Sequence, residues 1–243
     1  MSNISSQSNR VDRIISDRSP FELVEAYRNL RTNIYFSIPG KELCKKIIFT
    51  SSMPTEGKTT TSVNLAVTFA QTDNRVLLVD CDLRKPRINK FLKIREKTGL
   101  SSYLCGQASI EEVVVKTKYN NLFVMVAGII PPNPSELIGG KEMVELVAEL
   151  EKRFDYIIFD TPPLDTVSDA LVLVPLCDGV VIVAKHNVST HPYLQKTIKK
   201  LEFANAKILG LILNGFNEKK KYSYYKYEYK FKNDFINKKE KWW

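Results

Sequence analysis

Phosphate chemistry is suggested by one loop, Ser52-Met53-Pro54-Thr55-Glu56-Gly57-Lys58-Thr59-Thr60. The apolar run Ile47 to Phe49 precedes this loop and a helix-like run, Ser62 to Ala70, follows it. A strand, a tight loop ending in Gly-Lys-Thr and a helix form the usual setting of a phosphate-binding loop, although Ser52 replaces the first Gly of the common pattern. An ordinary glycine-rich turn would not explain a lysine at a helix N-terminus, where the dipole disfavours cations unless an anion is also present.

The loop therefore predicts a bound nucleotide. Its backbone amides and the helix N-terminus would donate hydrogen bonds to phosphate oxygens. Lys58 would reach the β and γ phosphates, and the Thr59 hydroxyl would hold Mg²⁺. The expected nucleotide-binding residues in this loop are Pro54, Thr55, Glu56, Gly57, Lys58, Thr59 and Thr60.

Three aspartates follow two further apolar runs. Asp80 and Asp82 come after the strand-like run Arg75 to Val79, and Asp160 comes after Tyr156 to Phe159. The carboxyl ends of parallel strands are where α/β sheets bind their ligands. Asp80 and Asp82 would point the same way if the strand continued that far, and two such charges favour a cation between them. We expect Mg²⁺ to be held by Thr59, Asp82 and Asp160, directly or through water.

The remaining elements predict an α/β fold. Further strands are expected at Leu122 to Ala127, Gly179 to Ala184 and Lys207 to Leu213, with helices at Pro20 to Ser37 and Ser135 to Phe154. Strands that alternate with helices indicate a P-loop NTPase-like fold, with a mostly parallel central sheet and helices on both faces. We divide the chain into a polar leader (1–17), one nucleotide-binding domain (18–216) and a tail (217–243).

Composition limits the function classes. The 243 residues are 44% hydrophobic, enough for one cored domain, and the four cysteines form no C-x-x-C pair that would suggest a metal site. No apolar run reaches about 18 residues, and the polar N-terminus lacks a signal-peptide apolar region, so we expect a cytoplasmic protein.

The tail is unlike the rest of the chain. Nine of its residues are lysines and four are acids, so it carries +5 of the total charge of +9. Five of the eleven tyrosines lie within eight residues: Tyr222, Tyr224, Tyr225, Tyr227 and Tyr229. This composition predicts disorder. The tail could stack on single-stranded nucleic acid, lie on an anionic membrane or supply tyrosines as substrates.

Several motifs decide among these alternatives, because together they resemble the bacterial tyrosine kinases. Val79-Asp80-Cys81-Asp82-Leu83-Arg84 is similar to the Walker A′ motif of that family, and Phe159-Asp160-Thr161-Pro162-Pro163 occupies the Walker B position. The runs Ala127 to Leu137 and Ser168 to Ala170, and the tyrosine-rich end, also resemble the family. Glu25, Arg28 and Arg31 share one helix face, which by itself suggests intrahelical ion pairs; in this family the same spacing is an oligomerisation motif.

The resemblance implies an ATP-dependent protein-tyrosine kinase. Lys58, Asp80 and Asp82 would be catalytic, with Asp80 helping to deprotonate a tyrosine, and Asn214 would contact the base of ATP. The five tail tyrosines would be phosphorylated between subunits of a ring-shaped homo-oligomer. This resemblance argues against nucleic-acid binding as the role of the tail.

The resemblance is closest to the cytoplasmic subunits that control capsule or exopolysaccharide synthesis. It implies recruitment to the inner face of the membrane by the cytosolic segment of a transmembrane activator, and an opposing tyrosine phosphatase. The rival interpretation is a partition or division-site ATPase switch that phosphorylates no protein. Those ATPases carry a signature lysine where this chain has Met53.

Overall fold

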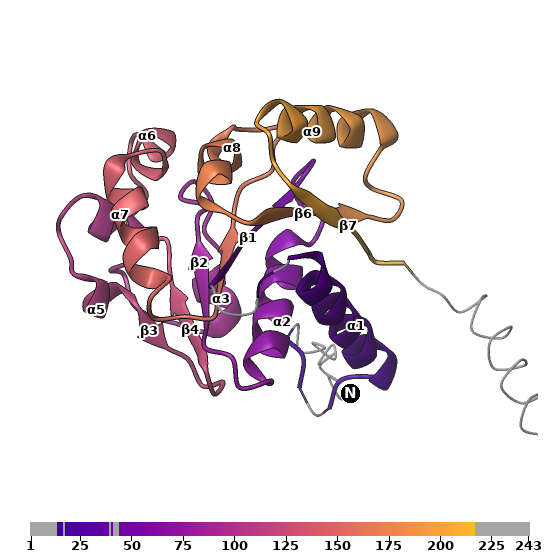
Figure 1. Cartoon of the computed structure of the whole chain (residues 1–243), viewed down its shortest axis with the longest axis horizontal. Helices are drawn as coiled ribbons and strands as arrows, with labels where there is room; N and C mark the ends of the chain where they lie inside the picture. The colour runs from indigo at the N-terminus through magenta and orange to yellow at the C-terminus, as the bar shows by residue number, and fades with distance from the viewer. Residues whose placement is uncertain (1–13, 17, 39, 41–43, 217–243) are drawn as a thin grey trace, which may run out of the picture.

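The computed structural model describes residues 14–16, 18–38, 40 and 44–216, and within them the chain forms a seven-stranded sheet with helices on both faces (Figure 1). The strands are β1 (Lys45–Ser51), β2 (Val76–Asp80), β3 (Val115–Lys116), β4 (Leu122–Met125), β5 (Tyr156–Asp160), β6 (Gly179–Lys185) and β7 (Ile208–Asn214). The expected α/β fold with a mostly parallel sheet is confirmed.

The helices are α1 (Phe21–Ser37), α2 (Lys58–Ala70), α3 (Ile88–Leu92), α4 (Leu100–Leu104), α5 (Ile110–Val113), α6 (Pro134–Ile138), α7 (Lys141–Leu150), α8 (Asp169–Leu173) and α9 (His191–Phe203). A short 3₁₀ turn, η1 (Val174–Leu176), follows α8.

The strand order β3-β4-β2-β5-β1-β6-β7 determines where the site forms. Only β3 runs antiparallel to its neighbour, whereas β1 lies parallel between β5 and β6. The register places Asp80 opposite Asp160 at the carboxyl ends of β2 and β5. The loop that follows β1 therefore lies at the same edge of the sheet as these two carboxylates.

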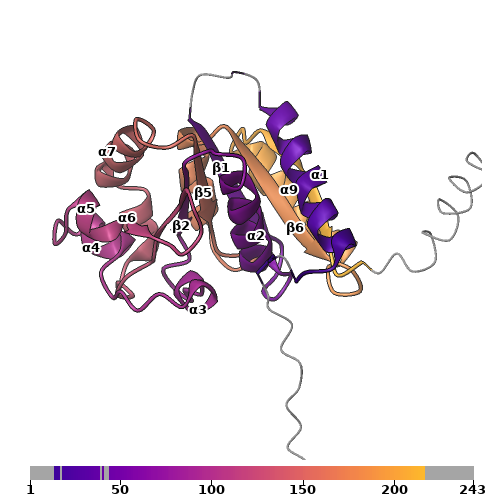
Figure 2. The same cartoon turned by 90° about the horizontal axis from the view of Figure 1, so that it is seen from below.

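Two apolar layers cover the sheet. On one face α2 packs against the strands through side chains such as Leu65 and Phe69, and α1 packs on α2, as Figure 2 shows. On the other face α7, α8 and α9 bury residues that include Leu146, Ala170 and Leu201. Strands covered on both faces read as continuous apolar runs, which is why the sequence located them well.

One expectation about the helices is wrong in detail. The helix predicted over Ser135 to Phe154 is divided into α6 and α7 by Gly139 and Gly140, because glycine weakens a helix interior. The helix predicted over Pro20 to Ser37 is observed as α1, in which Tyr27 and Ile34 are buried and Phe21 is 72% exposed.

No helix in the part of the chain that the structure describes is long and apolar enough to cross a membrane. The leader apart from residues 14–16, and the whole tail with its five tyrosines, lie outside the described residues.

Candidate active site

The conformation of the phosphate-binding loop depends on Gly57. This residue is the N-cap of α2 and has a φ of 93°, in the left-handed region that favours glycine. A Cβ atom here would lie 1.8 Å from Asn214 Nδ2, so a larger residue would displace the Asn214 side chain. The Asn214 side chain thus covers Gly57 closely, and the left-handed turn leads directly into the helix N-terminus, whose backbone N–H groups can bind a phosphate.

Three of the expected site residues meet directly behind this loop. Lys58 Nζ lies 2.6 Å from Asp160 Oδ1, and the Thr59 hydroxyl donates to Asp160 Oδ2 at 2.6 Å. Lys58 is only 6% exposed and Asp160 only 1%. The arrangement joins a phosphate-binding ammonium to a hydroxyl and a carboxylate, the oxygen ligands that Mg²⁺ prefers.

Asp80 is a fully buried acid at the end of β2. Burial, followed by the nearby charge of Asp160, raises its pKa from 3.8 to about 7. Its carboxylate accepts backbone N–H groups from Asp82, Arg87 and Ile88. A carboxylate held in a fixed direction, with a pKa near neutrality, has the properties of a general base.

Asp82 is placed differently from the sequence expectation. Because β2 ends at Asp80, the strand does not carry Asp82 onto the same face, and its Oδ1 accepts the N–H of Lys85 at 3.0 Å. Asp160 raises the pKa of Asp80 more than Asp82 does. The described residues contain no group of three or more His, Cys, Asp or Glu side chains able to hold a metal.

Glu56 is a buried residue whose side chain stabilises the phosphate-binding loop through hydrogen bonds. It is 1% exposed, and its carboxylate accepts the N–H of Met53 at 2.9 Å and the hydroxyl of Ser189. Asn214 Nδ2 donates to the backbone oxygen of Glu56 at 3.2 Å. The loop is thus braced by residues that follow β6 and end β7. Sequence reasoning missed Ser189, because no local pattern marks it.

Comparison with known proteins decides the family. An AAA domain family model matches residues 44–209. The tyrosine-protein kinase YwqD of Bacillus subtilis (strain 168) is 40% identical over 214 residues, which cover 88% of this chain and 89% of that protein. This chain belongs to the bacterial tyrosine-protein kinases. The kinase domain of Escherichia coli tyrosine kinase ETK agrees, with 33% identity, a TM-score of 0.77 and coverage of 88% of this chain and 87% of that one.

The division-site ATPases share the fold of this kinase but are more distant. The septum site-determining protein MinD of Pyrococcus horikoshii OT3, solved with Mg-ADP, is 24% identical, with a TM-score of 0.62. The two structures match over 73% of this chain and 72% of that one. The rival interpretation as an ATPase switch is therefore less well supported than the kinase interpretation.

A second buried acid joins three of the kinase's motifs. Asp169, with no exposed surface, binds Arg84 Nε at 3.1 Å through Oδ2 and accepts the Ser135 hydroxyl at 2.5 Å through Oδ1. Arg84 Nη2 also donates to Ser135 Oγ at 2.9 Å. The motifs are separate in the sequence, and no local pattern predicts that their polar residues form one network.

The residues of the expected oligomer interface are divided between two roles. Arg28 pairs with Glu25 at 2.6 Å on the exposed side of α1, as the simple ion-pair interpretation predicts. Arg31 instead donates to the backbone oxygen of Thr68 on α2 at 2.9 Å. Ring formation by this kinase stays a prediction, as does phosphorylation of the tail tyrosines.

Proposed function

We propose that this kinase transfers the γ-phosphoryl group of ATP to tyrosines in its own C-terminal tail, between subunits of a ring. The observation that carries the proposal is the contact of Lys58 and Thr59 with the Asp160 carboxylate at 2.6 Å. It gathers the phosphate-binding ammonium and two metal-binding groups at the start of one helix. The proposed acceptors are Tyr222, Tyr224, Tyr225, Tyr227 and Tyr229.

Each residue has a distinct part in this chemistry. The loop from Pro54 to Thr60 binds the phosphates, Lys58 stabilises negative charge on the transferring group, and Asn214 lies beside the loop where it could contact the base. Mg²⁺, bound with the nucleotide by Thr59, Asp82 and Asp160, would neutralise charge on the phosphate oxygens.

Asp80 would take the proton from the acceptor hydroxyl. A tyrosine OH has a pKa of about 10, so it requires a base as the O–P bond forms. Burial raises the pKa of Asp80 to about 7, which makes it a stronger base than an exposed aspartate. General-base assistance of this kind contributes roughly 10²–10⁴-fold to rate.

The biological setting is also a proposal. The relatives include proteins named CapB of Staphylococcus aureus and CpsD of Streptococcus species, and a solved chimerical protein is named CapA2B2. Together with the family resemblance, these names support a role in capsule or exopolysaccharide synthesis. We propose that the cytosolic segment of a transmembrane activator recruits the kinase to the inner face of the membrane and that a tyrosine phosphatase reverses its action.

A mixed-protomer assay tests transfer between subunits. A Lys58→Met chain supplies tail tyrosines without catalysis, and a chain with all five tail tyrosines changed to Phe supplies catalysis without these acceptors. Incubation of both with Mg-ATP should place phosphotyrosine on the Lys58→Met chain, as read by mass spectrometry. If that chain gains none while the wild type labels its own tail, transfer between subunits is wrong. ATP hydrolysis without any phosphotyrosine would instead favour the ATPase switch.

A further inference from the structure

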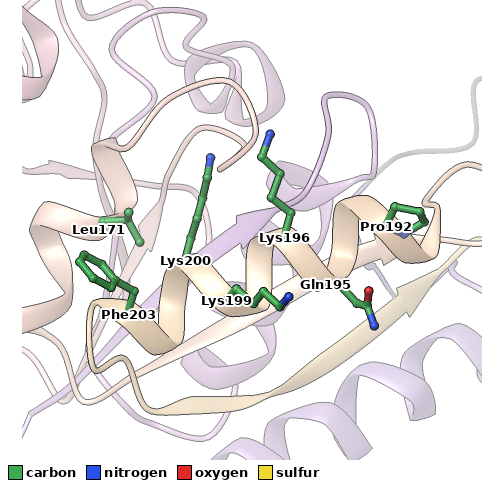
Figure 3. Close-up of a pocket in the computed structure, with 7 residues that line it drawn as sticks. All are labelled: Leu171, Pro192, Gln195, Lys196, Lys199, Lys200 and Phe203. Carbon is green, nitrogen blue, oxygen red and sulfur yellow. The ribbon is translucent and has the colours of Figure 1, made fainter.

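A basic hollow lies along α9, and its lining includes none of the residues of the nucleotide site. It has a volume of about 470 Å³ and is shown in Figure 3. Lys196, Lys199 and Lys200 of α9 line it together with Leu171 of α8 and Phe203 at the end of α9. Phe203 is 91% exposed, so its ring is accessible to a ligand. The hollow thus combines three cations with an apolar, aromatic end.

The three lysines are not equally engaged. Lys196 Nζ pairs with Asp165 at 2.7 Å, and Lys200 Nζ donates to the backbone oxygen of Leu164 at 2.5 Å. Lys199 is exposed and has no ion pair within the described residues. Because the lining contains three lysines and no acid, and Asp165 pairs with only one of the three, the hollow keeps a net positive charge that favours an anionic ligand.

The size and chemistry of the hollow suit an aromatic anion. Pockets of roughly 300–1,000 Å³ accept small ligands or inserted side chains. A phosphotyrosine would place its phosphate oxygens against lysine ammonium groups and its ring against Phe203 and Leu171. An anionic lipid surface would also be attracted by the lysines, but a concave site with an apolar end fits an inserted side chain better than a flat bilayer.

We propose that this hollow binds phosphotyrosine from the tail of the chain, residues 217–243, after the tail has been modified. The inference rests on the proposed function, since the ligand is the product of that reaction. It adds a product-binding site on the kinase domain, separate from the active site.

The last described residue, Phe216, lies near the loop that leads into α9. The end of β7 pairs with the end of β6, since Asn214 lies opposite Lys185 and the ring of Phe216 is 5.2 Å from that of His186. Only a short loop separates His186 from the start of α9, and Figure 1 shows α9 lying along β6 and β7. Tyr222 follows Phe216 by six residues, a reach of at most about 20 Å, close to the length of a 13-residue helix.

Charge makes the contact depend on phosphorylation. The unmodified tail carries +5 and would be repelled by the lysines of α9. Each phosphotyrosine adds about −1.5 to −2 at neutral pH, so five of them would add roughly −8 to −10 and reverse the sign of the tail. Binding should therefore be weak before the reaction and favourable after it.

A binding experiment that needs no catalysis tests the inference. Full-length kinase with its five tail tyrosines changed to Phe is titrated with a synthetic peptide of residues 217–232, labelled with a fluorophore and carrying five phosphotyrosines. We expect saturable binding by fluorescence anisotropy, and at least about tenfold weaker binding of the unmodified peptide.

Variants of the hollow identify the site. Lys196→Glu/Lys199→Glu should weaken phosphopeptide binding at least about tenfold, whereas Lys93→Glu/Lys97→Glu, the same change of charge at two other exposed lysines, should alter it less than about twofold. Phe203→Ser should weaken it about threefold or more through the lost ring contact, without affecting the fold, because the side chain is 91% exposed. Thermal unfolding of each variant confirms that it is folded.

Three outcomes would overturn the inference. The first is equal binding of the modified and unmodified peptides, and the second is phosphopeptide binding that Lys196→Glu/Lys199→Glu leaves unchanged. The third is binding of the parent to phosphatidylserine vesicles through Phe203 with no binding of the phosphopeptide, which would assign the hollow to a lipid surface. Mass spectrometry of the wild-type tail after incubation with Mg-ATP tests the proposed function separately, so either idea can fail alone.

Discussion

Replacement of Arg84 should show how much the stability of the domain depends on the hydrogen-bond and ion-pair network around Asp169. Asp169 has no exposed surface, so Arg84→Ala leaves a buried carboxylate with only the Ser135 hydroxyl as a partner. Breaking a fully buried pair in this way costs about 3–5 kcal/mol, and partial exposure of the Arg84 side chain (38%) should reduce the loss to about 2 kcal/mol. Asp169→Asn should cost about 1 kcal/mol, because its amide can still bond Ser135 and the remaining guanidinium reaches water.

Urea unfolding of the four members of this double-mutant cycle measures the difference. Arg84→Ala/Asp169→Asn should be less destabilised than the sum of the single variants, since it leaves no buried charge alone. Arg153→Ala is the matched control: Arg153 pairs with Glu111 at 2.8 Å, with side chains 41% and 68% exposed, and should lose less than about 0.5 kcal/mol. The stabilising role of the Arg84–Asp169 pair would be refuted if Arg84→Ala lowered the free energy of unfolding no more than Arg153→Ala, or if the effects of the two single variants simply added in the double variant.

Three further predictions follow from the site and α1. Gly57→Ala should abolish tight binding of a fluorescent ATP analogue and lower the free energy of unfolding in urea by at least about 1–2 kcal/mol. The reason is that Gly57 has a φ of 93° and that the new Cβ would lie 1.8 Å from the Asn214 amide. Unchanged binding of the analogue would contradict the loop geometry. In chelator and without nucleotide, the free energy of unfolding should fall as pH rises from about 4 to about 7, because Asp80 keeps in the folded state a proton that the unfolded chain has released. Asp80→Asn should flatten this fall, and an equally steep fall would assign it to another group. Arg28→Ala and Arg31→Ala should both shift the oligomer to smaller species in light scattering. Only Arg31→Ala should also lower the free energy of unfolding, by about 1 kcal/mol, since the Arg31 guanidinium bonds a backbone carbonyl of α2. Equal stability of the two variants would count against that contact.

The sheet could be predicted well from the sequence because its strands are nearly continuous apolar runs. The runs at Ile47, Tyr156 and Gly179 each fall within an observed strand. Helices α3, α4, α5, α6 and α8 have only four or five residues each and show no reliable periodicity. The two glycines between α6 and α7 are a local signal that could have divided the predicted helix correctly.

Part of the candidate site could also be predicted from the sequence. Lys58, Thr59 and Asp160 were brought together by motif spacing and by the rule that parallel strands present ligands at their carboxyl ends. The supporting contacts were not accessible, because Ser189 lies 133 residues from Glu56 and Asp169 lies 85 residues from Arg84. Such pairs depend on how loops from different strands meet, which local pattern does not encode.

The brace between Asn214 and the phosphate-binding loop has a consequence for biosynthesis. The loop is translated early, but the side chain that covers Gly57 and bonds Glu56 comes 158 residues after Glu56. A nascent chain that lacks β7 therefore has a loop without its final support, and domains acquire such long-range contacts late. The residues made directly after Asn214 lead into the tyrosine-rich tail. The phosphoryl-donor site and its proposed acceptors would thus become available at nearly the same moment of translation.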